Sequence, residues 1–209
     1  MNPIFTGVGV ALITVFHDDL RVDIEATTKL AIRLVGEGIS SILIGGTTGE
    51  AATLSTSERA QLVASISAAT DVPVIAGTGA PSGAQAAEQT AACIESGAAA
   101  VLVLSPPRVP DPRAYYAAVA AVAGQTPMLA YHFPLQSPPG IEVDMLAQLP
   151  IVGLKDSSGD ANRLLHEVAT YDGLIYPGAP SLSLMAGALG LPGVLLAIAN
   201  AKPQEAIAA

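Results

Sequence analysis

Short apolar runs alternate along this chain with longer stretches that have helical periodicity. The apolar runs are continuous, without the polar alternation of a half-exposed strand, which indicates strands buried on both faces. Such strands occur mainly in parallel sheets covered by helices on both sides. We expect them at residues 7–15, 41–45, 72–77, 99–104, 128–132, 151–155, 174–176 and 193–198.

The stretches between these runs predict helices. Ser55 and Glu58 have the spacing of a capping box, and Gly38 and Gly97 follow two of the periodic stretches as stop signals. Asp111 followed by Pro112 predicts another helix start, with the proline at the first helical position. The helices are expected at residues 23–37, 55–70, 82–96, 112–123, 143–149, 160–170 and 181–189, and a further one begins near Pro203.

Eight strands that alternate with helices favour a (β/α)8 TIM barrel, and a doubly wound open sheet is the alternative. No linker, charge block or low-complexity segment divides the chain, so we expect a single barrel domain over residues 1–209. A barrel of this type typically has about 250 residues. The chain stops within the predicted eighth helix, so we expect the end of helix 8 and any C-terminal helices to be lacking.

Composition narrows the classes of function. Hydrophobic residues make up 51% and charged residues 13% of the chain, which indicates a sizeable core, and the net charge of −9 makes a nucleic-acid partner a poor expectation. Cys93 is the only cysteine and fits a reducing compartment. There is no signal peptide pattern, and no uninterrupted apolar run reaches the roughly 18 residues of a membrane span. We therefore expect a cytoplasmic protein with no membrane partner.

The most informative residue is Lys155, in the run Gly153-Leu154-Lys155-Asp156-Ser157-Ser158-Gly159-Asp160. It stands at the carboxyl end of a predicted buried strand, where functional groups collect in a barrel. The run alone fits two interpretations. The amine either points into solvent beyond the strand, or is desolvated with a lowered pKa, as carbonyl chemistry requires.

Other predicted strand ends bring compatible groups to the same mouth. Tyr131 supplies a phenol, and Thr47 and Thr48 lie in a Gly-rich turn whose backbone N–H groups, including that of Gly46, can hold a carboxylate. An amine, a proton-relaying phenol and a carboxylate cradle suit Schiff-base chemistry on a keto acid. Taken singly, each residue has a plainer interpretation: Tyr131 as a core tyrosine, the threonines as turn residues, and Glu50 as a cap of the next helix.

No metal or organic cofactor is expected. His17, His132 and His166 have no metal-ligand spacing with one another or with Cys93. Residues 77–83 follow a strand as GxGxxxG, not as the GxGxxG of dinucleotide sites, and we interpret them as a tight barrel turn.

Taken together, these residues resemble the dihydrodipicolinate synthase / N-acetylneuraminate lyase family of class I aldolases. The resemblance extends over essentially the whole chain. It is carried by residues 45–54 (GGTTGEAATL), 76–79 (AGTG), 131–134 (YHFP) and 153–160 (GLKDSSGD).

The resemblance implies roles for single residues. Lys155 would form the Schiff base with pyruvate or a related 2-keto acid, Tyr131 would relay protons, and Thr47 would orient that tyrosine. Thr48 would bind the keto-acid carboxylate, and Gly178 and Leu195 match backbone contacts near the bound keto acid. The family also implies a homo-oligomer, a dimer or a tetramer.

Two departures from the lysine-biosynthesis enzymes of this family concern the second substrate. Their tyrosine in the loop after strand four is absent from residues 105–110 (SPPRVP), and Gln136 stands where they have a carboxylate-binding arginine. Glutamine offers no charged bidentate fork. We therefore favour a lyase or aldolase for pyruvate or a related 2-keto acid with a sugar-acid-like substrate. The alternatives are a true 4-hydroxy-tetrahydrodipicolinate synthase, which joins pyruvate to aspartate semialdehyde, and a non-catalytic keto-acid sensor.

Overall fold

The computed structural model of the protein describes residues 2–209 and contains one sheet of eight parallel strands. The strand order is β7-β6-β5-β4-β3-β2-β1-β8, so each strand pairs with its neighbour in the chain and β1 also pairs with β8. The strands are β1 Gly7–Ala11, β2 Ser41–Ile44, β3 Val74–Gly77, β4 Ala100–Leu104, β5 Met128–His132, β6 Gly153–Asp156, β7 Leu174–Pro177 and β8 Gly193–Leu196.

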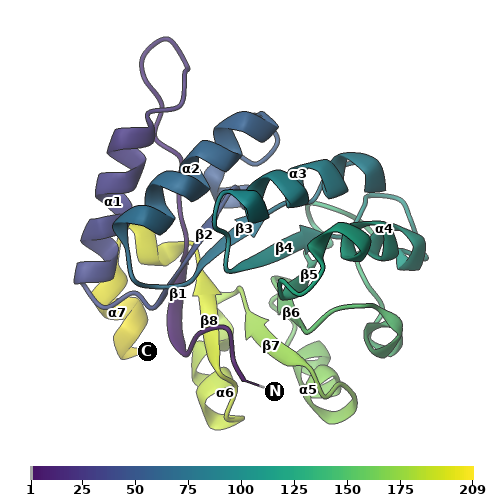
Figure 1. Cartoon of the computed structure of the whole chain (residues 1–209). Coiled ribbons are helices and arrows are strands. Elements are labelled where there is room, and N and C mark those ends of the chain that lie inside the picture. Colours follow the sequence, from purple (N-terminus) through teal and green to yellow (C-terminus); the bar gives the residue numbers. More distant parts are fainter. Residues whose placement is uncertain (1) are drawn as a thin grey trace.

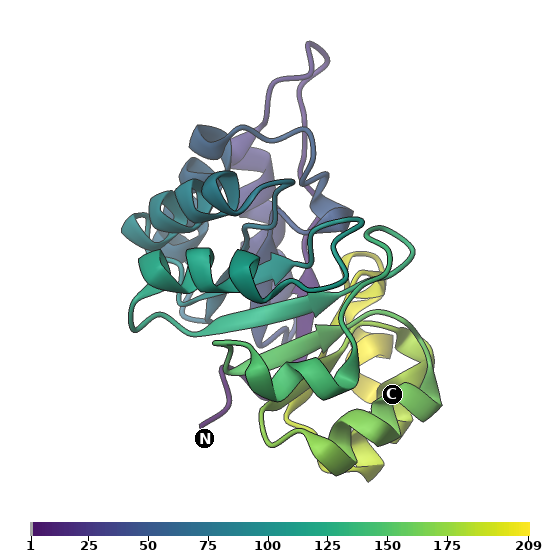
Figure 2. The same cartoon turned by 90° about the vertical axis from the view of Figure 1, so that its right-hand side faces the viewer.

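Helices surround these strands (Figure 1), which confirms the predicted (β/α)8 barrel. A 3₁₀ helix, Val143–Gln148, connects β5 to β6 and lies against α5 (Figure 2). The α-helices are α1 Ile24–Gly36, α2 Thr56–Ala69, α3 Gly83–Glu95, α4 Arg113–Ala123, α5 Ala161–Thr170, α6 Ser183–Ala188 and α7 Pro203–Ala208.

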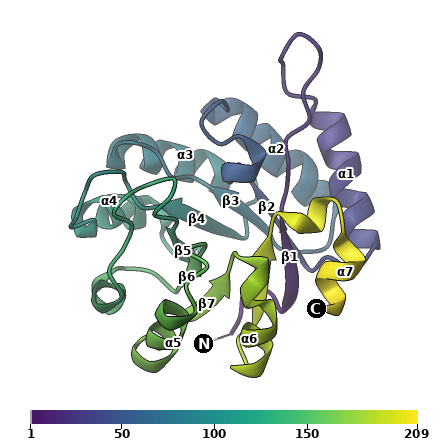
Figure 3. The same ribbon diagram turned by 180° about the vertical axis from the view of Figure 1, so that it is seen from behind.

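The ring of strands closes between β7 and β8 by side-chain packing. Within residues 2–209 these two strands show no ladder hydrogen bonds to each other, although they lie side by side. The amino-terminal segment lies beside β7, next to the gap in the hydrogen-bonded ring (Figure 3). There the Tyr176 hydroxyl donates to the Phe5 carbonyl at 3.0 Å, and the two rings stack with centroids 4.5 Å apart. The N-terminal segment is thereby fixed to β7.

The core has two layers, as the alternation of side chains along each strand requires. One cluster fills the barrel interior and draws on seven of the eight strands, including Leu43, Ile75, Leu129 and Tyr131. The larger cluster lies between the strands and the helices. Within the described chain, no helix is long and apolar enough to cross a membrane.

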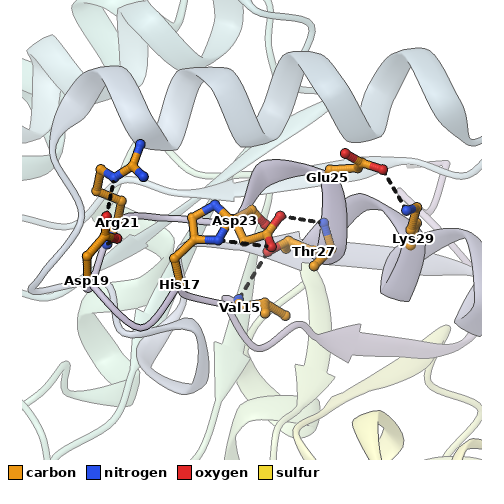
Figure 4. A network of polar contacts seen from close by, with 9 residues as sticks. Val15, His17, Asp19, Arg21, Asp23, Glu25, Thr27 and Lys29 are labelled. Atoms are coloured by element: carbon orange, nitrogen blue, oxygen red, sulfur yellow. Dashed lines mark hydrogen bonds and ion pairs between the residues drawn. The ribbon is translucent and has the colours of Figure 1, made fainter.

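The first strand is shorter than its apolar run predicts. It ends at Ala11, and the chain then forms a projecting loop whose base is fixed by α1 (Figure 4). The Val15 amide donates to the Thr27 hydroxyl at 3.0 Å, and the Asp23 carboxylate caps α1 by accepting from the Ala26 amide at 2.8 Å. Leu12 still donates to the Leu43 carbonyl of β2, so side-chain acceptors replace the expected sheet partners only beyond it.

Two predicted helices differ in detail. The 143–149 stretch is a 3₁₀ helix over Val143–Gln148, a short element between Pro139 and Pro150. Helix α4 begins one residue later than predicted, with Pro112 at the N-cap, and Asp111 accepts from the Arg113 amide at 3.1 Å. The capping box of Ser55 and Glu58 at α2 is confirmed.

Candidate active site

Lys155 lies inside the mouth of the barrel and not in solvent. It is the third residue of β6 and only 4% exposed, and its Nζ lies 4.4 Å from the centre of the Tyr131 ring. Burial lowers the pKa of this amine from its usual 10.5 to about 7. A large fraction of the amine is therefore neutral, and nucleophilic, near neutral pH.

Tyr131 faces Lys155 because the two residues are register partners on β5 and β6. Burial raises the pKa of the phenol above its usual 10. Hydrogen bonds with the side chains of Ser157 and Thr47 act in the opposite direction, and the nearby Asp156 carboxylate raises the pKa further. The phenol is thus held in its protonated form between two hydroxyl groups, an arrangement that can pass protons in either direction.

The turn after β2 presents Thr47 and Thr48 at the mouth. Residues Thr47–Gly49 form a 3₁₀ turn whose N-cap, Gly46, provides no side-chain cap, so the first N–H groups of the turn can donate to a ligand. Thr47 is exposed and Thr48 is half-buried. Glu50 does not cap α2, because Ser55 does so through the Glu58 amide.

Arg59 of α2 holds this turn in place from behind. The side chain is 1% exposed, and its guanidinium donates to the carbonyls of Gly45 at 2.9 Å, Gly77 at 2.6 Å and Ala51 at 2.8 Å. These carbonyls belong to the ends of β2 and β3 and to the turn itself. Three charge-assisted hydrogen bonds from one planar group therefore fix the relative positions of the segments that present Thr47.

Gly178 follows β7 and packs directly on Lys155. A Cβ added at Gly178 would lie 2.9 Å from Lys155 Cε and would overlap Ser157 Oγ. Leu195 of β8 is fully buried in the barrel interior, where its side chain covers Gly9. The fold therefore brings Lys155, Tyr131, Thr47 and Gly178 together, and it places Leu195 in the packed interior.

Two cavities adjoin these groups. A small one of about 30 Å³ is lined by Gly46, Thr47 and Tyr131 among others. A larger one of about 420 Å³ shares Thr47, Ala51, Gly79 and Leu104 with it and extends to Gln136. Thr48, Gly178 and Leu195 line neither cavity.

A buried charge cluster lies behind Lys155, between β6 and α5. Asp156 points away from the mouth, and its Oδ2 lies 3.4 Å from Nε of Arg163, which is itself 2.8 Å from Glu167 Oε1. Both carboxylates are fully buried. Burial raises the pKa of Glu167 to about 8, and Asp156 raises it too while Arg163 lowers it. The buried amine of Lys155 and this cluster thus lie on opposite sides of β6.

A sequence profile of the dihydrodipicolinate synthetase family matches residues 4–208. The chain belongs to this family. The protein is accordingly an enzyme, a carbon–carbon or carbon–oxygen lyase of the class I aldolase type.

Named sequences and solved structures are similar to this chain. The 4-hydroxy-tetrahydrodipicolinate synthase of Methanothrix thermoacetophila is 32% identical over 97% of this chain and 72% of its own. The Acinetobacter baumannii dihydrodipicolinate synthase complexed with pyruvate has a TM-score of 0.88 at 32% identity, covering 97% of this chain and 73% of its own. CdNal of Clostridium difficile, solved with mannosamine, has a TM-score of 0.88 at 20% identity over 97% and 74%, and shares the fold.

Two residues of the site, Ser157 and Arg59, were not predicted from the sequence. Ser157 lies two positions after Lys155, so strand alternation puts both side chains on one side of the sheet, and that spacing was an available signal. Arg59 gave no local signal, because its partners come from two other strand ends. Among the described residues, no group of three or more histidine, cysteine, aspartate or glutamate side chains is placed to hold a metal ion.

Proposed function

We propose that this synthetase-family protein is a Schiff-base-forming lyase or aldolase that acts on pyruvate or a related 2-keto acid. The observation that carries the proposal is the buried amine of Lys155, 4.4 Å from the Tyr131 ring centre and with a pKa of about 7. A neutral amine beside a protonated phenol has the two functions that imine formation needs.

The chemistry follows from these two groups. Lys155 Nζ attacks the ketone carbon, the ketone oxygen takes a proton, and the resulting carbinolamine loses water to give a protonated imine. In cleavage, the substrate hydroxyl gives up its proton, the adjacent C–C bond breaks, and its electron pair moves into the imine to leave an enamine and a free aldehyde. Tyr131 relays the protons, and Thr47 and Ser157 hold the phenol in place. Protonation and hydrolysis of the enamine release the keto acid.

The turn after β2 is proposed to hold the keto-acid carboxylate. Backbone N–H groups at the start of Thr47–Gly49, after Gly46, together with the Thr48 hydroxyl can donate to it. Gly178, whose backbone lies against Lys155, and Leu195, in the barrel interior, are proposed to contact the bound keto acid through their backbones. The imine serves as the electron sink, so the proposed reaction uses no metal or organic cofactor.

The second reactant remains open between two proposals. Gln136, exposed at the rim of the larger cavity, favours a sugar-acid-like substrate whose only carboxylate sits on the keto-acid half. The names of the relatives at 32–33% identity favour 4-hydroxy-tetrahydrodipicolinate synthase activity. Measuring the condensation of pyruvate with aspartate semialdehyde distinguishes the two. A homo-oligomer and a cytoplasmic location stay predictions.

Borohydride trapping tests the proposal directly. Incubation with pyruvate and sodium borohydride should add the mass of a reduced pyruvyl group to the peptide that contains Lys155, and Lys155→Ala should abolish the adduct. The chain has only two other lysines, and Lys29, exposed and paired with Glu25 at 2.6 Å (Figure 4), provides a matched control. Lys29→Ala should trap normally. No adduct across a panel of 2-keto acids would refute the proposal.

A further inference from the structure

Arg59 carries a positive charge that no carboxylate of the described chain pairs with. Its side chain is 1% exposed, and within residues 2–209 it takes part in no ion pair. Cys93, the one titratable side chain that acts on its pKa, is uncharged near neutral pH, because burial raises the pKa of the thiol to about 11. Arg163, by contrast, lies between two carboxylates. A guanidinium stays charged when buried, so carbonyl groups offset only part of the desolvation of Arg59.

The three carbonyls that accept from Arg59 belong to residues that line the small cavity beside Tyr131. That cavity, of about 30 Å³, has Gly45, Gly77 and Ala51 in its wall. Arg59 itself does not line the cavity, so its guanidinium lies behind this wall. A Cβ on Gly45 would overlap Nη1 of the guanidinium, so the close approach requires glycine there. The unpaired charge is thus held directly behind the groups that face Tyr131.

One of these carbonyls transmits the charge of Arg59 toward the turn after β2. The Gly45–Gly46 peptide is trans, so its N–H points opposite to the C=O that accepts from the guanidinium at 2.9 Å. No backbone carbonyl or side chain among the described residues accepts that N–H. A donor bound to the carbonyl polarises the peptide and strengthens the N–H as a donor. Gly46, the N-cap of the Thr47–Gly49 turn, therefore presents a polarised donor on the side away from Arg59.

The same turn has a second support that brings no charge. The Thr14 hydroxyl, in the loop after β1, donates to the Gly49 carbonyl at 2.7 Å, and Thr14 is buried. Thr14 and Arg59 both fix the position of the turn, and only Arg59 adds a positive charge to it. The two contributions, position and charge, can therefore be separated by substitution.

We propose that Arg59 is the counter-charge of the keto-acid carboxylate and acts on it through the Gly45–Gly46 peptide, without touching the ligand. This inference rests on the proposed Schiff-base function and on the carboxylate site proposed at the turn. A carboxylate that binds there balances a buried charge that the free protein leaves unpaired. A neutral group in the same place gains the hydrogen bonds without this attraction. Arg59 is thus a positioning residue that also selects for an anionic ligand.

Pyruvate and its neutral amide, pyruvamide, test the proposal as two ketones of similar size. Mass spectrometry of borohydride trapping at Lys155, below saturation, gives an efficiency for each ketone. In Arg59→Gln, which removes the charge and keeps a hydrogen-bonding side chain, the ratio of pyruvate to pyruvamide efficiency should fall by about tenfold relative to the unaltered protein. An unchanged ratio would overturn the inference and leave the proposed function intact. No adduct with either ketone in the unaltered protein would refute both.

Two further variants separate charge from the position of the turn. Thr14→Val removes the bond to Gly49 and no charge, so it should lower trapping of both ketones by the same factor and leave the ratio unchanged. A fall in that ratio equal to the fall in Arg59→Gln would contradict the proposal. Arg59→Lys keeps a charge and should hold the ratio within about threefold of the unaltered protein. It also decides the question if Arg59→Gln does not fold, since a tenfold lower ratio in folded Arg59→Lys, checked by circular dichroism, would exclude charge as the cause.

Discussion

The reactivity of Lys155 depends on how completely the fold removes water from one ammonium group. The side chain is 4% exposed and contacts the face of Tyr131, and Gly178 packs against its Cε. Without a carboxylate to stabilise the charged form, burial alone lowers its pKa. The ring whose face contacts the amine also carries the phenol that we propose as the proton relay.

The rate of trapping should follow the titration of this amine. Because the pKa of Lys155 is lowered to about 7, the neutral fraction increases as the pH rises through that value. We expect the borohydride-dependent adduct with pyruvate to form more slowly at pH 6 than at pH 8, with a midpoint near pH 7, measured by mass spectrometry over short times. A midpoint near 10, as for a solvated lysine, would contradict the desolvation argument.

Removal of the Tyr131 hydroxyl should separate binding from proton transfer. Tyr131→Phe keeps the ring beneath Lys155 and loses only the oxygen that interacts with Thr47 and Ser157. We expect kcat to fall by about 10² to 10⁴-fold while KM for the keto acid changes little. Steady-state kinetics with the accepted aldehyde would show this. Tyr171→Phe, which alters a tyrosine outside both cavities, serves as the control.

At the scale of elements, β6 and α5 form a unit with a reactive face and a charged back. Asp156 accepts from the Ser158 amide at 2.6 Å and from its hydroxyl at 3.0 Å, which shapes the end of the strand. Behind it, two buried carboxylates share Arg163. The neighbouring His132 is neutral, because burial lowers its pKa to about 4 and its Nδ1 accepts from the Ile141 amide.

This cluster makes stability depend on pH. The pKa of Glu167 is about 8 in the folded protein and near 4.5 when unfolded, so between these values the folded protein binds the extra proton. The free energy of unfolding contributed by this group therefore falls as pH rises from about 5 to 8. Glu167→Gln should flatten this decline in urea unfolding at a series of pH values. Glu95→Gln, an exposed change on α3, should leave it unaltered.

Sequence patterns predicted the local parts of this structure and missed the long-range ones. The bounds of β5 and the capping box of α2 depend on neighbours a few residues apart, and both were predicted. The three carbonyls held by Arg59 lie on separate segments, so no local pattern reveals them. The position of Lys155 at a strand mouth was predicted, but its degree of burial depends on packing by Tyr131 of β5 and by Gly178 in the turn after β7.

At the scale of the whole molecule, the barrel is held by seven hydrogen-bonded strand pairs and, between β7 and β8, by packing. Tyr176, in the barrel interior, compensates for the missing β7–β8 hydrogen bonds by anchoring the N-terminal segment. Its hydroxyl donates to the Phe5 carbonyl and accepts from the Ile4 and Phe5 amides at 3.1 and 3.3 Å. Residues about 170 positions apart are thereby joined, and Tyr176 itself is the register partner of Lys155 on β7.

Removal of the Tyr176 hydroxyl should lower the free energy of unfolding and leave the reaction at Lys155 unchanged. Tyr176→Phe keeps the ring stack on Phe5 but leaves a buried carbonyl and two amides without their partner. We expect a loss of about 1–3 kcal/mol in the free energy of unfolding, measured by denaturant titration, with the pH midpoint of Lys155 trapping unchanged. A shift in that midpoint would show that the anchor also shapes the mouth.

The missing ladder between β7 and β8 also determines where the barrel first opens. Amides on the facing edges of these strands have no carbonyl of the opposite strand to hold them within the described residues. Their protons should exchange with deuterated solvent sooner than those of β3 and β4 in the middle of the sheet. Native-state hydrogen exchange would thus show the contact between β7 and β8 opening before the rest of the sheet. Opening of that contact would release the N-terminal segment first.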